Sequence, residues 1–165
     1  MAIGDIKILE QASMTGRGAR LYNVAAGATT INPGEPVVLP TGLGATTVIP
    51  APTNSPVANS DYFVGIAATT STQTSGTAGT VGVYPADPLI TYIIKPKVAA
   101  SWDTQAEYDA LVGKSVLLDL TSGTYTILAT NPQVNTNGCV IQAMNINEHP
   151  GMVAFTVKSS AINLR

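Results

Sequence analysis

Cys139 and His149 are the pair of residues in this sequence best suited to nucleophilic chemistry. They are the chain's one cysteine and one histidine. A thiolate activated by a neighbouring imidazole attacks acyl carbons. However, Cys139 stands in the segment GCVIQAM, which is typical of a buried strand, and His149 precedes Pro150 in a turn pattern. We therefore interpret Cys139 as a buried core residue and His149 as an exposed turn residue, and we predict no catalytic residues.

Metal and carboxylate chemistry has little support either. A structural zinc site needs about four Cys or His ligands, and the chain offers two. No D-x-D-x-D-G calcium loop is present. The scattered carboxylates that remain for calcium are Asp61, Asp87 and Asp119. A glycosidase needs a pair of carboxylates, and the candidates here are Asp103, Glu107 and Asp109. Acidic residues are also expected at the start of a helix, without any catalytic role. We predict no metal and no cofactor.

The glycine-rich and aromatic stretches do not form a recognisable ligand site. Thr41–Ala45 and Gly76–Gly82 lack the Lys-Ser/Thr of a phosphate-binding loop, so turn glycines are the better interpretation. The aromatic residues are dispersed, which favours core and sheet positions over stacking platforms. A carbohydrate site around Trp102 and Tyr108 stays open as an alternative.

Charge is scarce in this chain and excludes one class of partner. Charged residues make up 11% of its 165 residues, the net charge is −2 and the pI is about 5.1, whereas an average chain has about 25% charged residues. No Lys or Arg lies between Arg20 and Lys95, so we predict no nucleic-acid binding. Low charge is unfavourable for a free, concentrated monomer, and we hypothesise that partners cover much of the surface.

The N-terminal residues and the lengths of the apolar runs argue against a membrane protein. Met1–Asp5 lacks the basic start and apolar run of a signal peptide. No apolar stretch approaches the roughly 18 residues that span a bilayer. We expect a protein made in a reducing cytoplasm, without disulfides and without membrane contact.

The stretch Asp61–Lys97 is the predicted centre of the fold. It contains three strand patterns, Tyr62–Ala67, Thr77–Tyr84 and Leu89–Ile94, with an exposed hairpin loop at Thr69–Gly76. Pro85 and Pro88 flank the turn between the second and third strands. Because proline lacks a backbone donor, it marks the ends of strands rather than their middles.

The remaining segments add hairpins, turns and one helix. Asn32–Glu35 is a turn, and Pro36–Pro40 is predicted to be an edge or end strand because proline bounds it. The helix is predicted over Ser101–Val112, with Asp103 or Ser101 as its cap and Gly113 after its end. Further predictions are strands in Leu21–Leu39 and at Thr46–Ile49, a hairpin over Ser115–Ala129, a hairpin of Cys139–Ile146 with Met152–Lys158, a turn at Asn137–Gly138, and a final edge strand or tail over Ser159–Arg165.

Two segments are predicted to make contacts rather than core. Residues 1–20 include Lys7, Arg17 and Arg20, three of the eight basic residues. They read either as a partly ordered terminus or as an arm that docks on a neighbour. Thr41–Ser60, rich in Pro, Thr, Ala and Gly, reads as a long surface loop. We predict two parts, an arm of residues 1–20 and one β domain of residues 21–165.

The region Tyr22–Tyr84 contains NVAAGATTINPGEPVVLP, in which a turn introduces a Pro-Gly-Glu-Pro-Val strand, and FVGIAAT, which is predicted to pair with GTAGTVGVYP. Through these motifs the region resembles the small head decoration, or cement, proteins of tailed bacteriophages. The absence of catalytic residues agrees with it. The half after Tyr84 does not match the pattern.

The resemblance implies a compact β-barrel or β-tulip body, a homotrimer, and binding across joints between major capsid protein subunits on the outer surface of the virion. We accordingly expect an all-β fold, a β-barrel or β-sandwich (β-tulip-like) with one short helix and an extended N-terminal arm. The expected function is non-enzymatic capsid stabilisation. The alternatives are another virion module, such as a tail, neck or fibre domain, and a small carbohydrate-binding or ligand-binding β module.

Overall fold

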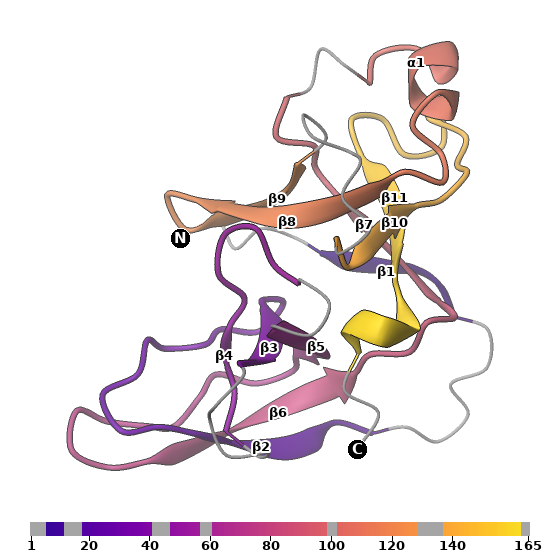
Figure 1. Ribbon diagram of the computed structural model, residues 1–165. Coiled ribbons are helices and arrows are strands. Elements are labelled where there is room, and N and C mark those ends of the chain that lie inside the picture. The colour runs from indigo at the N-terminus through magenta and orange to yellow at the C-terminus, as the bar shows by residue number, and fades with distance from the viewer. Residues whose placement is uncertain are drawn as a thin grey trace.

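The computed structural model describes residues 6–11, 18–40, 47–56, 61–98, 102–128 and 137–162 (Figure 1). Strands make up most of the regular structure in these residues, which confirms the all-β prediction. The elements in chain order are β1 (Lys7–Gln11), β2 (Arg20–Val24), β3 (Pro36–Pro40), β4 (Ile49–Pro50), β5 (Asp61–Ala67), β6 (Gly79–Pro85), β7 (Ile90–Ile94), α1 (Gln105–Asp109), β8 (Ser115–Thr121), β9 (Thr124–Leu128), β10 (Cys139–Ile141), β11 (Val153–Val157) and the 3-10 helix η2 (Ser159–Ala161).

The strands form two antiparallel sheets. One has the order β1-β7-β11-β10-β8-β9, and the other has the order β2-β6-β5-β3-β4. In Figure 1 the first sheet lies above the second. Of the two predicted architectures, the two-layer sandwich agrees with this arrangement, whereas a closed barrel does not.

In each sheet, a bridge outside the named strands links two parts that are not neighbours in the strand order. In the five-stranded sheet, Thr47 forms a parallel bridge with Asn23 of β2, and the amide of Val48 donates to the Asn23 carbonyl at 2.8 Å. In the six-stranded sheet, Pro96 bridges to Ile127 of β9. These bridges are short and do not complete a barrel.

The main hydrophobic core lies between the sheets and joins them. Phe63 of β5 meets Tyr92 of β7 edge to face, with ring centroids 5.9 Å apart, and Tyr92 stacks on Phe155 of β11 at 5.4 Å. All three side chains are almost completely buried. Because aromatic rings bury large areas and prefer these geometries, this trio is a principal contact between the two layers.

A second core lies on the other face of the five-stranded sheet. It contains Val37 and Val64, among other aliphatic side chains of β2, β3, β5 and β6. Since β3 and β5 therefore contact a core on each face, both strands are buried along most of their length. Such two-sided burial produces continuous hydrophobic runs such as PVVLP instead of strict alternation.

A β-bulge in β5 sets which of its residues face each core. The register pairs Phe63 with Val38 and Gly65 with Val37, so Val64 is the extra residue. Gly65 has a φ of 151°, and a Cβ there would overlap the Tyr84 carbonyl. Glycine is therefore required at this bulge. The extra residue places Phe63 and Ile66 on the same face, although strict alternation would separate them.

The three predicted central strands exist but do not form one sheet. β5 and β6 pair as a hairpin, as predicted, whereas β7 belongs to the six-stranded sheet. The connection from Pro85 to Ile90 therefore carries the chain from one layer to the other. The predicted turn at Pro85 and Pro88 is real, but it does not join two neighbouring strands. Proline lacks the amide that would continue a ladder.

Two predictions about sheet edges require correction or refinement. β3 is not an edge strand, because β4 pairs with it on one side and β5 on the other. Within the predicted arm of residues 1–20, Lys7–Gln11 forms β1, which pairs with β7 at the edge of the six-stranded sheet. Residues 1–5 and 12–17 lie outside the described residues.

The local predictions of the second half hold well. β8 and β9 form the predicted hairpin through Ser122 and Gly123, and β10 pairs with β11. The helix is shorter than predicted, and its cap is Thr104 rather than Asp103, while Ser101 lies outside the described residues. Gly113 has the positive φ of 81° expected after a helix. The Asn137–Gly138 turn was predicted to join an earlier segment to the Cys139 strand. That earlier segment lies outside the described residues. Within Ser159–Arg165, predicted to be a final edge strand or a tail, Ser159–Ala161 form η2, and residues 163–165 lie outside the described residues.

Candidate functional site

The structure places Cys139 and His149 at opposite ends of one hairpin. Cys139 begins β10 and pairs with Val157, at the end of β11, whereas His149 lies in the connection between the two strands. Cys139 is completely buried, and this burial raises the pKa of its thiol well above the usual range. A buried neutral thiol distant from the imidazole is a poor nucleophile, so the hairpin does not assemble a Cys–His pair.

The calcium candidates do not converge. Among the described residues, no group of three or more His, Cys, Asp or Glu side chains could hold a metal ion. The Asp87 carboxylate accepts a hydrogen bond from the Leu89 amide at 2.9 Å, as in a local turn. Asp119 Oδ2 lies 2.9 Å from the Lys97 ammonium, so its counter-ion is a lysine. Asp61 lies at the start of β5.

The acids near α1 have structural partners. Glu107 forms a capping box with Thr104, whose hydroxyl accepts from the Glu107 amide at 3.3 Å. Asp109 accepts a hydrogen bond from the Gln105 side chain at 2.7 Å. Such contacts stabilise the ends of a helix, and they account for the two carboxylates without a glycosidase pair.

Trp102 and Tyr108 pack in the core rather than forming a sugar-stacking platform. Their ring centroids lie 5.8 Å apart, and only 5% of Trp102 is exposed. The Tyr108 hydroxyl donates to the Gln142 carbonyl at 2.8 Å and accepts from the Ala154 amide at 2.9 Å. Burial raises the pKa of Tyr108, which keeps the hydroxyl protonated for this donation. The faces of both rings are therefore unavailable for sugar stacking.

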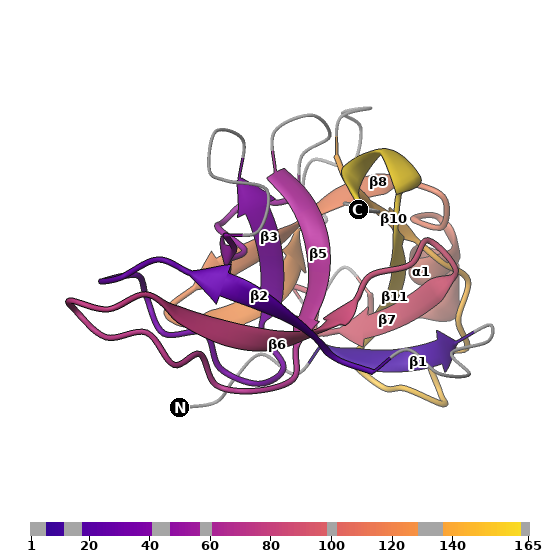
Figure 2. The same cartoon turned by 90° about the horizontal axis from the view of Figure 1, so that it is seen from below.

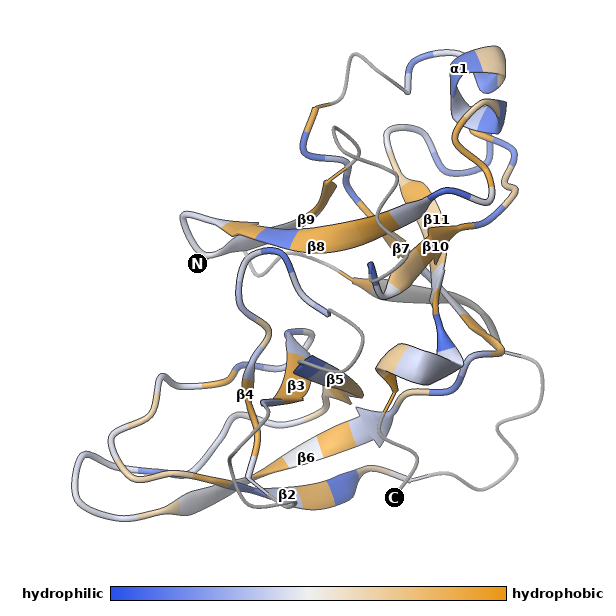
Figure 3. Cartoon of the chain, in the orientation of Figure 1, coloured by the Kyte–Doolittle hydropathy of each residue, from blue (hydrophilic) through white to orange (hydrophobic). Residues whose placement is uncertain are grey.

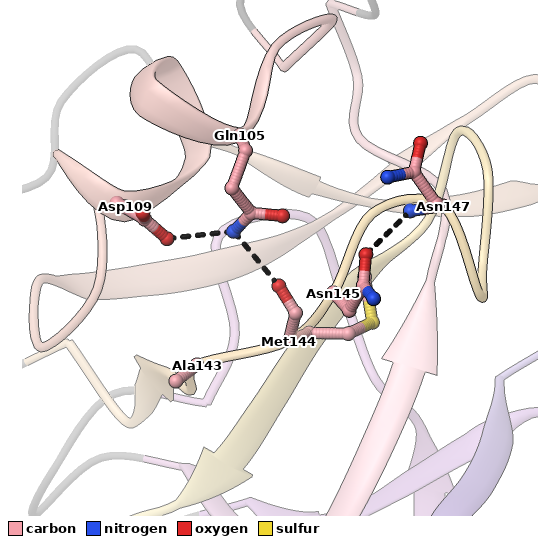
Figure 4. Close-up of a pocket in the computed structure, with 6 residues that line it drawn as sticks. All are labelled: Gln105, Asp109, Ala143, Met144, Asn145 and Asn147. Atoms are coloured by element: carbon pink, nitrogen blue, oxygen red, sulfur yellow. Dashed lines mark hydrogen bonds between the residues drawn. The ribbon is translucent and has the colours of Figure 1, made fainter.

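A wide, shallow hollow beside α1 has polar groups that mostly bind one another (Figure 4). Gln105 makes three of the hydrogen bonds in this hollow. Its side-chain nitrogen donates to the Asp109 carboxylate and, at 3.0 Å, to the Met144 carbonyl. Its side-chain oxygen accepts from the Ile146 amide at 3.1 Å. The Asn147 amide donates to the Asn145 side chain at 3.0 Å. These bonds attach the helix to the 144–147 segment, so the arrangement serves the fold.

A more distinctive surface lies on β2 and β6, which run side by side at the front of Figure 2. Val81 and Val83 of β6 are buried in the second core, so their neighbours point to the opposite side. The register pairs Leu21 with Gly82 and Asn23 with Thr80. This opposite side, the β2–β6 face, is formed by Leu21, Asn23, Thr80, Gly82 and Tyr84.

The β2–β6 face carries no charged residue and exposes two large apolar side chains. Leu21 is 77% exposed and Tyr84 is 45% exposed. On the same side of the sheet, Ile66 pairs with Tyr84 but is buried in the main core. The six-stranded sheet thus covers this side over β3 and β5. On β6 the Thr69 side chain lies over Gly82, which is buried, whereas Leu21 and Tyr84 stay exposed. Exposed apolar groups on an uncharged sheet surface are characteristic of a protein interface.

Only part of the signal for this face is local in the sequence. Alternation in TVGVY predicts which β6 residues are buried, yet nothing local shows that β2 pairs with β6. Long-range pairing was needed to place Leu21 beside Gly82, because about 60 residues separate them in the chain. In Figure 3, β2 combines hydrophobic and strongly hydrophilic segments, whereas β6 is hydrophobic to weakly polar.

The predicted contact loop Thr41–Ser60 has a partly internal role in its described portion, residues 47–56. Ala51 and Ser55 are completely buried. The Leu118 amide donates to the Ser55 carbonyl at 2.8 Å, and Thr53 donates to the Leu120 carbonyl at 2.9 Å. This segment therefore ties the five-stranded layer to β8. Its exposed residues, Pro52–Asn54, are the ones left for outside contacts.

Comparison with known proteins gives no relative for this chain: no family model, no curated protein and no solved structure matches it. Within the described residues, no helix is both long enough and apolar enough to cross a bilayer.

Proposed function

We propose that this chain is a non-enzymatic virion structural protein that binds the outside of a phage capsid and stabilises it by bridging major capsid protein subunits. The observation that carries the proposal is the β2–β6 face, where Leu21 and Tyr84 are exposed on an uncharged sheet surface. The face supports a protein partner. The resemblance of Tyr22–Tyr84 to decoration proteins supports the capsid as that partner.

The chemistry of the face suits a protein partner better than a nucleic acid or a charged surface. Nucleic-acid binding depends on lysine and arginine contacts to phosphates, and no residue of the face is charged. Tyrosine is enriched in protein interfaces because its ring buries area while its hydroxyl remains hydrogen-bonded. The face therefore favours contact with polar backbone and apolar side chains of another protein.

A homotrimer is part of the proposal, because one small face gives limited affinity. Three copies that engage neighbouring capsid subunits together bind far more tightly than one copy, since the second and third contacts are intramolecular. Three chains of 17.0 kDa would give a particle of 51 kDa, which light scattering distinguishes from a monomer.

The test is co-sedimentation with undecorated capsids, using Leu21→Asp as the disrupting variant. A charge on the exposed apolar face leaves an unpaired carboxylate in the interface, so we expect capsid affinity to fall at least about tenfold. The matched control is Val112→Asp. Val112 is also exposed and follows α1 by three residues in the chain. Because α1 lies at the opposite end of the molecule from β2 in Figure 1, this variant should bind like the original protein.

The outcomes separate the proposal from its alternatives. Failure of the unaltered protein to pellet with capsids would contradict capsid binding. Binding to isolated tails instead would favour a tail, neck or fibre module. Equal binding by both variants would leave capsid binding intact and show that the β2–β6 face is not the contact. Light scattering on the same samples reports whether Leu21→Asp acts on the trimer or only on capsid binding.

A further inference from the structure

Leu21 of β2 turns both of its backbone hydrogen-bonding groups away from β6. Its cross-strand partner is Gly82, which uses both of its own groups on the opposite side of β6. The Gly82 amide donates to the Thr69 hydroxyl at 2.9 Å, and the Gly82 carbonyl accepts from the Ala68 amide at 2.7 Å. Residue pairs in an antiparallel ladder exchange either two hydrogen bonds or none. The Leu21 amide and carbonyl therefore point to the outer side of β2.

The arrangement two residues later agrees with this direction. Thr80, the partner of Asn23, bonds Thr72 through both its amide and its carbonyl, each at 3.0 Å. The Asn23 carbonyl is left for the outer side, where it accepts from the Val48 amide at 2.8 Å. This outer contact is a single bridge, and β2 is the end strand of its sheet. Among the described residues, the outer edge of β2 before Asn23, residues 18–22, therefore has no bridged neighbour.

The side chain at this open edge favours the addition of another strand. An unpaired strand edge is a template for a further extended chain, and proteins often protect such edges with a bulge. The end strand of the other sheet, β1, has an irregular register between Ile8 and Glu10. β2 instead presents Leu21, which is 77% exposed. An added strand would bond the Leu21 backbone and also cover its apolar side chain.

Arg20 argues against a second copy of β2 as that strand. It is the charged residue of β2, and it is exposed. An antiparallel pair of β2 strands centred on Arg20 would place two arginines opposite each other, which is destabilising. A pair centred on Leu21 would place Ala19 of the second copy opposite Asn23. The outer side of Asn23 is already occupied by Val48. A different strand with a carboxylate opposite Arg20 meets neither obstacle.

We infer that the outer edge of β2 receives an extended segment of the major capsid protein as an added strand. The segment carries an apolar residue opposite Leu21 and, next to it, an acidic residue opposite Arg20. The inference rests on the proposed function and gives the chemistry of the capsid segment. Backbone hydrogen bonds to Leu21 hold the segment, and the opposite charges at Arg20 select it, since such cross-strand pairs stabilise a sheet.

Two substitutions of Leu21 separate its backbone from its side chain. Leu21→Ala keeps the amide and removes the apolar side chain, whereas Leu21→Pro also removes the outward N–H, which the β2–β6 ladder does not use. Both variants should therefore remain folded, as checked by far-ultraviolet circular dichroism. In co-sedimentation with undecorated capsids, we expect Leu21→Pro to bind at least about tenfold more weakly than Leu21→Ala, because the capsid segment loses a backbone donor.

Amide hydrogen exchange tests the same contact without any substitution. In the free protein, the Leu21 amide should exchange at least about tenfold faster than the Tyr22 amide, which points toward Val81 of β6. On capsids, exchange at Leu21 should slow, because the added strand accepts its hydrogen. The Val112 amide, which donates to the Asp109 carbonyl after α1, is the remote control and should not change.

Arg20→Glu tests the acidic residue of the capsid segment. Two carboxylates would then face each other across the added strand, so we expect about tenfold weaker capsid binding at low salt and a smaller loss at high salt. Lys95→Glu is the matched control, because it makes the same change of charge at an exposed position just after β7. This control should bind like the original protein.

The results distinguish this inference from the proposed function. If the unaltered protein does not pellet with capsids, the proposed function fails and the capsid segment fails with it. If it pellets, but Leu21→Pro binds like Leu21→Ala and capsids do not slow exchange at Leu21, strand addition alone is overturned. Equal binding by the two glutamate variants overturns the acidic residue. If Leu21→Pro instead dissociates a trimer in light scattering, and capsids do not protect Leu21, the added strand comes from a second copy and the capsid segment is overturned.

Discussion

At the scale of single residues, Asp119 is the charged side chain that the fold buries among the described residues. It lies on β8, which is otherwise hydrophobic over most of its length (Figure 3). Thr121 donates to its Oδ2 at 2.6 Å, and Lys97 lies 2.9 Å from the same oxygen. Burial alone would raise the pKa of Asp119, but the Thr121 hydrogen bond and the Lys97 charge together leave it below 3.8.

The depressed pKa predicts a defined dependence of stability on pH. The folded protein binds the Asp119 proton less readily than the unfolded chain does, so the carboxylate contributes stability at pH values above 3.8. This contribution is lost as the pH falls through the lower folded pKa. Lys97→Met should remove much of it and shift acid unfolding to higher pH, as measured by circular dichroism during acid titration.

The loss of stability that Lys97→Met causes at neutral pH depends on how exposed the Lys97 side chain is. Breaking a fully buried ion pair costs about 3–5 kcal/mol, but 41% of the Lys97 side chain is exposed, so a smaller loss is expected. Lys95→Met is the matched control, because the Lys95 side chain is exposed while its backbone still bonds Ile127. If both variants unfold at the same pH, Lys97 does not stabilise the Asp119 carboxylate.

At the scale of elements, α1 illustrates what a local pattern can and cannot predict. The T-x-x-E sequence of Thr104 and Glu107 is a capping box, and the structure contains both of its reciprocal hydrogen bonds. The sequence prediction favoured Asp103 or Ser101 because it placed the start of the helix too early. A cap side chain must reach the amide two or three residues onward, and here the residue that meets this condition is Thr104.

Replacing the cap should therefore have a larger effect than replacing its neighbour. Thr104→Ala removes the acceptor for the Glu107 amide and should lower the free energy of unfolding by about 0.5–2 kcal/mol. Asp103→Ala should change it by less than about 0.5 kcal/mol, as for ordinary surface positions. Urea denaturation of both variants measures the difference, and a greater loss for Asp103→Ala would show that the capping box contributes little.

Hairpins were predictable from sequence, whereas sheet membership was not. The β8–β9 turn at Ser122–Gly123 has positive φ at both residues. The turn residues and the alternating apolar residues on either side of it are close together in the chain, so the local sequence was sufficient to predict this hairpin. The partners of β2 and β7 depend on contacts far along the chain, which no local window contains. The candidate β2–β6 face was missed for the same reason, although the burial of Cys139 could be inferred from its apolar neighbours.

At the scale of the whole molecule, the main core makes the two sheets interdependent. Phe63 belongs to the five-stranded sheet, yet its ring packs on Tyr92 of the six-stranded sheet. The 53–55 segment adds hydrogen bonds between the layers through Leu118. Neither sheet can keep its inner face covered if the other unfolds, because one continuous core contains residues from both. The two layers should therefore unfold together.

This coupling predicts one cooperative transition and a shared response to a core substitution. Phe63→Ala should lower the free energy of unfolding by about 3–5 kcal/mol, because it removes a large buried ring at the junction. The Trp102 fluorescence reports on the six-stranded side, although Phe63 lies in the other sheet. We expect fluorescence and far-ultraviolet circular dichroism to give coincident urea curves in both proteins, both displaced in the variant. A fluorescence midpoint that Phe63→Ala leaves unchanged would mean that the six-stranded layer is stable alone, and that the chain comprises two folding units rather than the single β domain expected for residues 21–165.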